Sequence, residues 1–437
     1  MSKEMMYAEK LSKMIQVETI SERGVANKHK FNQFHVVLKE LFPRVFAECE
    51  VVEIDSSLLI KMKGKSNGDP ILFMSHQDVV SATGKWQHEP FSGDIADGAV
   101  WGRGTVDTKG ALFCIFQAFE EALEDGYIPN VDVYIASSST EEVAGDGAPK
   151  TVKYLQDHGV HLQFLIDEGG MILDEPMKGV KGRFAMIGTV EKGTGNVRFV
   201  AKSAGGHASA PGRNTPLVRL GKFMAEIEDK DPNKGKMNPT VIEMFKRFGP
   251  YTKGALGFVF RNAKVLSPLL SKVLPKINPV GGAMIKTTMA FTMAEGSKGL
   301  NVLPETAYVN ANIRFIQHQG VKETMAILEP IAKKYDLEIE MLQCKEPQKA
   351  VDHTAAPFKL VESTVKEIYP DVVPSPYVMT GGTDAYYYYP VTDNAIRFAP
   401  LVINNQQYKS VHGLDENINI DALPKGVEFY KAIMKKV

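Results

Sequence analysis

Short apolar runs alternate with helical patterns through the first half of this 437-residue chain, and this alternation limits the fold more than any other feature. The segments at 71–76 (ILFMSH), 131–139 (VDVYIASSS) and 162–170 (LQFLIDEGG) have the length and side chains of buried strands. Helical patterns over 111–127 and 149–159 separate them. Strands and helices that alternate in this way form a parallel sheet covered by helices on both faces, so the sequence predicts an α/β fold.

A different pattern begins near residue 193. Four strand-like segments and two helical patterns follow one another in the order β-α-β-β-α-β. This order predicts a ferredoxin-like α+β domain over 193–345, inserted between two parts of the first domain at 1–192 and 346–437. An excursion at about 232–284 contains FVFRNAKVLSPLLSKVLPKI, which predicts an amphipathic helical hairpin rather than a linker.

The composition of the chain indicates which partners and which cellular compartment to expect. The charged residues nearly cancel, with a net charge of -1, so no broad basic field is expected for nucleic acid or an anionic membrane. Cys49, Cys114 and Cys344 lie far apart without C-x-x-C spacing, which predicts neither disulfides nor a thiolate zinc site. The N-terminus lacks the apolar run of a signal peptide, and no segment reaches about 18 uncharged apolar residues. We expect a cytoplasmic protein without nucleic-acid or membrane partners.

Candidate metal ligands follow the apolar runs. His76 comes after the first strand, and Asp78, two residues later, faces the same side of extended backbone, where its carboxylate can orient the imidazole. Acidic pairs follow the next two strands, namely Glu141 with Glu142 and Asp167 with Glu168. Because ligands of open α/β sheets gather at the carboxyl ends of the strands, we expect these side chains to meet there.

Two more candidates lie outside the strands. Asp107 occupies a glycine-rich turn just before a helix, where, taken alone, an N-cap role is the favoured explanation of an aspartate. His412 stands beside a glycine near the C-terminus, where the chain returns to the sheet. Carboxylates that repel one another at one edge require a cation, and a mixed imidazole and carboxylate set suits zinc, with manganese or cobalt as substitutes.

The motifs carry a resemblance to a known family. SHQDVV, WGRGTVDTKG, SSSTEE, LIDEGG, SAGGHASAP, NVLP, NIRF, GGTDA and VHG resemble, in order and spacing, the dinuclear zinc peptidase family of carboxypeptidase S, carboxypeptidase G, aminoacylase, carnosinase and succinyl-diaminopimelate desuccinylase. EEVAGDGA, LIDEGGMILD and the excursion look closest to the carboxypeptidase S branch, which also contains N-acyl amino acid hydrolases. The resemblance implies a di-zinc catalytic domain with an inserted ferredoxin-like lid and dimerisation domain.

The resemblance also assigns metal ligands. Asp107 would bridge two zinc ions, with His76 and Asp167 completing one site and Glu142 and His412 the other. Glu168 competes with Asp167, because the acid in this segment shifts by one residue between branches. Asp78 would hold the imidazole of His76, and the bond between Asp107 and Thr108 would be a cis peptide.

The remaining roles concern the reaction and the substrate. The resemblance implies that a metal-bridging hydroxide attacks an amide carbonyl, while Glu141 takes the proton and returns it to the leaving amine. His207 would reach the active site of a partner subunit and stabilise the oxyanion. Asn301 and Arg314 would hold the substrate, Arg314 through its carboxylate, and Gly382 in GGTDA would add backbone contacts.

One position departs from the family pattern, and three function classes stay open. Tyr386 stands where relatives commonly carry an arginine, so the affinity for an anionic group there is uncertain. The favoured function is a carboxypeptidase or dipeptidase that acts on small peptides, and the alternative is an N-acyl amino acid amidohydrolase. A catalytically silent metal-binding protein is disfavoured because Glu141 and all five ligand positions are present. We expect a homodimer, with a monomer whose lid closes in cis as the alternative.

Overall fold

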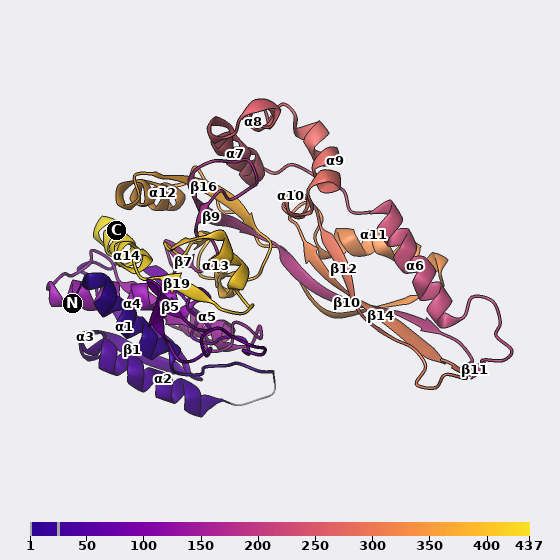
Figure 1. The fold of residues 1–437 in the computed structure, drawn as a ribbon, viewed down its shortest axis with the longest axis horizontal. Helices are drawn as coiled ribbons and strands as arrows, with labels where there is room; N and C mark the ends of the chain where they lie inside the picture. Colours follow the sequence, from indigo (N-terminus) through magenta and orange to yellow (C-terminus); the bar gives the residue numbers. More distant parts are fainter. Residues whose placement is uncertain (1, 24–26) are drawn as a thin grey trace.

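The fold consists of two lobes, each built on its own β-sheet (Figure 1). The computed structural model describes residues 2–23 and 27–437. None of the helices in these two ranges is long and apolar enough to cross a lipid bilayer. The three cysteines are unpaired thiols.

The larger lobe contains a ten-stranded sheet in the order β1-β2-β6-β3-β7-β17-β9-β8-β18, with β16 paired to β9. The central strands β6, β3, β7 and β17 run parallel to one another, and β16 runs parallel to β9. The bounds of the ten strands are β1 Glu50–Ile54, β2 Ser57–Met62, β3 Ile71–Met74, β6 Val133–Ser137, β7 Phe164–Asp167, β8 Ile172–Asp174, β9 Arg183–Glu191, β16 Val372–Met379, β17 Ala395–Arg397 and β18 Val402–Ile403.

Helices cover both faces of this sheet because successive strand residues point to opposite sides. Phe73, Ile135 and Ile166 join one buried cluster, and their neighbours in sequence, Leu72 and Leu165, join another. The first cluster lies under α1 (Lys3–Ile15), α2 (Lys28–Leu41), α4 (Lys109–Glu124), α12 (Ala356–Ile368) and α14 (Ala422–Lys436). The second lies under α5 (Gly147–Asp157) and the turn η2 (Asp384–Tyr388). The predicted α/β class with a mostly parallel central sheet is confirmed.

A small sheet connects two segments that are distant in sequence. Strand β19 (Asn417–Asn419) pairs with β5 (Ala99–Trp101), which pairs with β4 (Ile95–Ala96). Helix α13 (Asn405–Ser410) precedes β19. The turn that carries Asp107 follows β5 and the loop that carries His412 precedes β19, so this sheet holds the two candidate ligands near each other.

The smaller lobe is a four-stranded antiparallel sheet in the order β12-β14-β10-β15. Its strands are β10 Gly193–Lys202, β12 Thr288–Glu295, β14 Thr306–Phe315 and β15 Glu338–Lys345. Helices α6 (Pro216–Lys230) and α11 (Val321–Lys334) bury a shared core against it. At one end, the short strands β11 (Gly206–His207) and β13 (Val302–Leu303) pair with each other. That this lobe is an independent domain with boundaries at 193 and 345 stays a prediction.

The excursion at 232–284 is a group of short helices. It contains α7 (Pro239–Phe248), the turn η1 (Gly249–Tyr251), α8 (Gly254–Arg261), α9 (Ser267–Ile277) and α10 (Pro279–Ala283). These helices pack on β9 and β16 of the large sheet: the ring centroids of Phe184 on β9 and Phe248 on α7 are 4.8 Å apart. The segment at 258–277 is helical rather than a linker, because it contains the second half of α8 and all of α9. That the two helices form a hairpin stays a prediction.

Candidate active site

A cleft of about 670 Å³ lies between the carboxyl ends of the central strands and the four-stranded sheet. One wall is acidic and the other is basic. The acidic wall contains Asp107, Glu141, Glu142, Glu168 and His412, and the basic wall contains Lys192, Arg314 and Lys345.

The carboxylate of Asp107 joins two imidazoles. Its Oδ1 lies 3.0 Å from Nε2 of His76, and its Oδ2 lies 3.1 Å from Nε2 of His412. His412 Nε2 also lies 3.1 Å from Oε2 of Glu142. Ligand atoms of His76, Asp107 and Glu142 all lie within 4.8 Å of one another, so one cation could contact all three.

Asp78 is fully buried and connects His76 to the two glutamates. His76 Nδ1 lies 2.9 Å from the backbone oxygen of Asp78 and 3.4 Å from its Oδ1. The same carboxylate accepts hydrogen bonds from the backbone amides of Glu141 and Glu142, each at 3.1 Å, and from the Ser21 hydroxyl at 2.6 Å. Asp78 therefore fixes both the orientation of the imidazole and the position of the glutamate turn.

The two glutamates lie in the turn after β6 and face different neighbours. Glu141 Oε2 lies 3.9 Å from His76 Nε2, whereas Glu142 reaches His412. The second carboxylate oxygen of Glu142 is buried without a hydrogen-bond partner among the described residues. A buried carboxylate oxygen without a partner is costly, and a cation would satisfy it.

Burial, together with repulsion between neighbouring carboxylates, disfavours the charged forms of the acidic side chains in this wall. Burial raises the pKa of Glu141 and Glu168 well above the ordinary range, and it also raises that of Glu142. Burial opposes the charged form of His76, but the carboxylates of Asp107 and Asp78 outweigh it and raise the imidazole pKa well above its usual value. A divalent cation would stabilise the deprotonated carboxylates and the neutral imidazoles, which are the forms that bind metal.

The adjacent acids at the end of β7 have different surroundings. Asp167 Oδ1 accepts a hydrogen bond from the Glu168 amide and Oδ2 accepts one from the Ala385 amide, both at 2.8 Å. Glu168 instead lines the cleft. Both side chains stay candidates for the ligand.

Glu416 is a site residue that the sequence patterns did not reveal. It is fully buried and accepts hydrogen bonds from the amides of Gly104, Val106 and Asp107 at 2.8 to 3.0 Å, with Arg103 Nη1 at 2.7 Å. It therefore holds the turn that presents Asp107. The peptide bond after Asp107 is cis. The only sequence signal for Glu416 is its position four residues after His412.

In the basic wall, Arg314 and Lys345 come from the smaller lobe, and Lys192 lies between β9 and β10. Arg314 on β14 donates from Nε to Oδ1 of Asn312 at 3.1 Å and faces the cleft. Lys345 at the end of β15 places its ammonium 5.2 Å from the ring centroid of Tyr386 and 4.3 Å from that of Tyr387, whose hydroxyl it also contacts. A lysine from another strand thus supplies positive charge beside Tyr386, where the sequence alone indicated none.

A buried ion pair supports the GGTDA loop. Arg397 Nε and Nη2 lie 3.0 and 2.9 Å from Oε2 of Glu191. Glu191 in turn accepts hydrogen bonds from the amide and the hydroxyl of Thr383 at 3.2 and 2.9 Å. Gly382, which lines the cleft, is held in place by this pairing.

The structure does not bring His207 and Asn301 to this cleft. Both belong to the β11–β13 end of the smaller lobe, where the Ala208 amide donates to the Asn301 backbone oxygen at 2.8 Å (Figure 1). His207 is exposed and contacts Ser209 Oγ at 2.7 Å. Within one chain, these two predicted substrate contacts therefore lie apart from the metal cluster.

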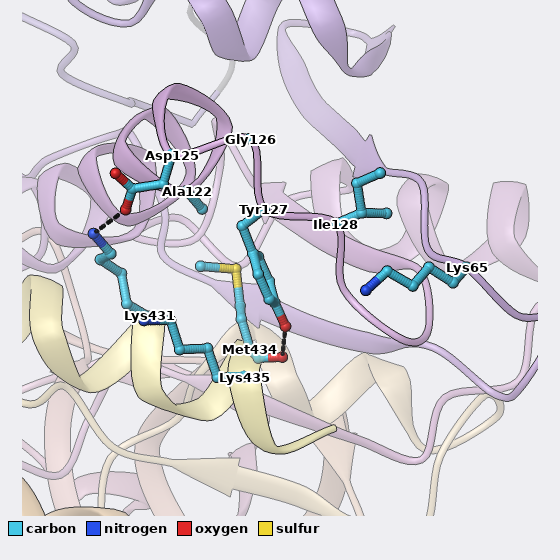
Figure 2. Close-up of a pocket in the computed structure, with 9 residues that line it drawn as sticks. All are labelled: Lys65, Ala122, Asp125, Gly126, Tyr127, Ile128, Lys431, Met434 and Lys435. Atoms are coloured by element: carbon cyan, nitrogen blue, oxygen red, sulfur yellow. Dashed lines mark hydrogen bonds and ion pairs between the residues drawn. The ribbon is translucent and has the colours of Figure 1, made fainter.

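A second cavity of about 370 Å³ lies near the ends of α4 and α14 (Figure 2). Tyr127 donates to the backbone oxygen of Met434 at 2.8 Å, and Lys431 pairs with Asp125 at 3.3 Å. These contacts fasten two helices together. The cavity contains no histidine and a single carboxylate, so it is not a second metal cluster.

An imidazole and carboxylate cluster at the carboxyl edge of an open α/β sheet is the arrangement expected of a metal-dependent active site. Residues 72–436 match the model of peptidase family M20/M25/M40, and the chain belongs to this family. The family resemblance predicted from the motifs is confirmed, including its carboxypeptidase S-like branch.

Relatives and solved structures agree with this assignment. The chain is 31% identical to the probable carboxypeptidase S-like 2 of Dictyostelium discoideum, over 98% of this chain and 84% of the relative. It is also 31% identical to the human N-fatty-acyl-amino acid synthase/hydrolase PM20D1, over 96% and 86%. The crystal structure of an M20 family metallo-carboxypeptidase from Sulfolobus solfataricus has the same fold, with a TM-score of 0.73, 17% identity and 99% coverage of both chains. Human carnosine dipeptidase 1 has a TM-score of 0.68 at 15% identity, covering 99% of this chain and 95% of that one.

Proposed function

We propose that this hydrolase uses two zinc ions to cleave amide bonds next to a free carboxylate, as a carboxypeptidase or dipeptidase. The observation that carries the proposal is the carboxylate of Asp107, whose two oxygens face His76 and His412 separately. A carboxylate with one oxygen toward each of two ligand groups is suited to bridging two metals. Cobalt or manganese could replace zinc in the same donor set.

The residues fit such ions. His76 would serve one metal and His412 with Glu142 the other, while Asp167 or Glu168 would complete the first site. The unpartnered buried oxygen of Glu142 and the raised pKa of three glutamates are the features that a pair of cations would compensate.

The side chains around the cleft have separate roles in the proposed reaction. Bound zinc lowers the pKa of a coordinated water and polarises a carbonyl oxygen. Glu141, beside the cluster, accepts the proton of the attacking water and then delivers it to the leaving amine. Asp78 keeps His76 oriented, and Glu416 keeps Asp107 in position. Arg314 and Lys345, on the opposite wall, bind the free carboxylate of the substrate.

The alternative is an N-acyl amino acid amidohydrolase with the same machinery. The likeness to N-fatty-acyl-amino acid synthase/hydrolase PM20D1 from human and other vertebrates favours it. Both substrate classes carry a free carboxylate next to the scissile amide, so the basic wall accepts either. Turnover of a panel of dipeptides and of N-acyl amino acids by the zinc-loaded protein distinguishes them.

Metal analysis tests the proposal. We expect about two zinc ions per chain and complete loss of amide hydrolysis on chelation, restored by added zinc. Metal content of Asp167→Asn and Glu168→Gln, compared with the parent chain, identifies which acid is the ligand. Trace metal together with activity indifferent to chelator would contradict the proposal.

A further inference from the structure

The segment at 232–286, which contains the excursion, carries a strong positive charge that the whole-chain balance hides. Residues 232–286 contain ten lysines and arginines and one acidic residue, Glu243, a net charge of +9. The chain as a whole has 51 basic and 52 acidic residues, so the remainder has a net charge of -10. This local concentration reverses what the overall charge of -1 predicts for anionic surfaces.

Most of this charge is free to act on a partner. Lys246 and Arg247 pair with Glu243, and Lys286 pairs with Asp231. Within the described ranges, no ion pair involves the other seven basic residues, which are Lys234, Lys236, Lys253, Arg261, Lys264, Lys272 and Lys276. All seven are exposed to solvent.

Large apolar side chains project from the same helices. Val265 is 80% exposed, Ile277 72% and Phe258 60%, and Leu269 and Val280 are also mostly exposed. On α9, Leu269, Lys272 and Lys276 recur at the spacing of one helical face, whereas Leu270 and Leu274 are buried in the core shared with β9 and β16. The outer face of these helices therefore combines apolar and basic side chains, whereas the opposite face of α9 is buried in that core.

The position of this face suits contact with an extended surface. Helices α8 and α9 lie at the outer edge of the molecule, on the far side of α7 from α12 (Figure 1). Lys192 on the cleft wall donates to the backbone oxygens of Ala283 and Lys286 at 3.0 and 2.8 Å. These hydrogen bonds connect the end of the excursion to the wall of the cleft.

We infer that the outer face of α8 and α9 docks on the surface of an anionic phospholipid bilayer. Lysines and arginines would contact lipid phosphates while Phe258, Val265, Leu269 and Ile277 enter the interface, as in amphipathic helices that lie on membranes. A two-fold dimer through this face is a poor alternative because the two copies of the face would carry like charges. Nucleic acid is also a poor fit, since the projecting side chains are mainly aliphatic and cannot stack on bases.

Flotation of the zinc-loaded protein with vesicles tests this inference. We expect binding to vesicles of phosphatidylcholine with phosphatidylglycerol at three to one, little binding to pure phosphatidylcholine, and release as salt is raised to about 0.5 M, because salt screens the charges. The double variant Lys272→Glu, Lys276→Glu should bind at least about tenfold more weakly. Phe258→Ser with Leu269→Ser should also weaken binding.

Matched controls lie on the smaller lobe. Lys322→Glu with Lys333→Glu on α11, and Met341→Ser on β15, change exposed residues of the same kinds and should bind vesicles as the parent does. All variants should retain hydrolysis of a small soluble substrate, which shows that they are folded and separates this inference from the proposed function. Equal vesicle binding by the excursion variants and the parent would overturn it. So would salt-sensitive binding to an acidic protein or to single-stranded DNA with no binding to vesicles.

Discussion

Glu141 and Glu142 are neighbours in sequence but face different groups, so substitutions at the two positions should have different effects on metal binding and turnover. Glu141→Gln should retain metal and lose roughly 100- to 10,000-fold in kcat, because a general base contributes about that much. Glu142→Gln should lose metal from one site, since its carboxylate faces His412 at 3.1 Å. Metal content and turnover, measured on both variants after zinc reconstitution, decide the roles. Equal metal loss, with normal turnover of Glu141→Gln, would show the assignment to be wrong.

Lys345 should contribute to binding rather than to chemistry. Lys345→Met should raise KM for carboxylate substrates by roughly 10- to 100-fold and change kcat little, because a charge-assisted hydrogen bond contributes about 1.5–3 kcal/mol to both ground and transition states. A substrate with its carboxylate converted to an amide should show no such difference between parent and variant. Lys349→Met, a change of an exposed lysine four residues away, is the control. An unchanged KM with a reduced kcat would contradict the binding role.

Some residues of the site could be predicted from the sequence, and others could not. The proximity of His76 and Glu142 was predictable because each follows a strand and strand ends converge at one edge, whereas Asp107 was assigned only through the family resemblance. The position of Lys345 in the site was not predictable, because its contact with Tyr386 depends on β15 lying beside the GGTDA loop at 381–385. Asp167 and Glu168 could not be ranked, because the sequence does not show which of two adjacent carboxylates accepts backbone amides and which lines the cleft.

At the scale of elements, apolar runs predicted three of the ten strands of the large sheet, β3, β6 and β7, and did not predict what the excursion packs against. A pattern shows which face of a helix is apolar, but not what covers it. The excursion core formed with β9 and β16 contains Phe245, whose ring lies 4.5 Å from that of Phe260 at 22°. This stacking fixes α7 against α8 and, through the shared core, both helices against the strands that frame the cleft.

Removal of that ring should therefore destabilise the protein. Phe245→Ala should lower the free energy of unfolding by about 3–5 kcal/mol, as expected for a buried phenylalanine that leaves a cavity. Phe258→Ala on α8 is the matched control: its side chain is exposed, and the change should be within about 0.5 kcal/mol. Urea denaturation followed by tryptophan fluorescence and circular dichroism measures both. A Phe245→Ala effect as small as the control would show that the excursion is not an integral part of the core.

At the scale of the whole molecule, the position of His207 needs an explanation. It lies at the far end of the smaller lobe, and exposed apolar side chains surround that end, including Leu217, Leu300 and Val302. A two-fold dimer that pairs this lobe with a partner would cover these side chains and could carry His207 to the partner's cleft. A monomer whose lid closes in cis is the alternative, and it requires the two lobes to move toward each other.

Subunit mixing distinguishes the dimer from the monomer. A His207→Ala chain and a Glu141→Gln chain should each be nearly inactive alone. If each site takes His207 from the partner, a mixed dimer has one site with both residues intact. An equimolar mixture under exchange conditions should then recover about a quarter of the parent activity, because half of the dimers are mixed and each has one competent site of two. Mixing Glu141→Gln with a Glu141→Gln, His207→Ala chain should recover nothing. A chain that stays monomeric at the assay concentration, or proven exchange without recovery, would leave His207 to act within its own chain or outside the reaction.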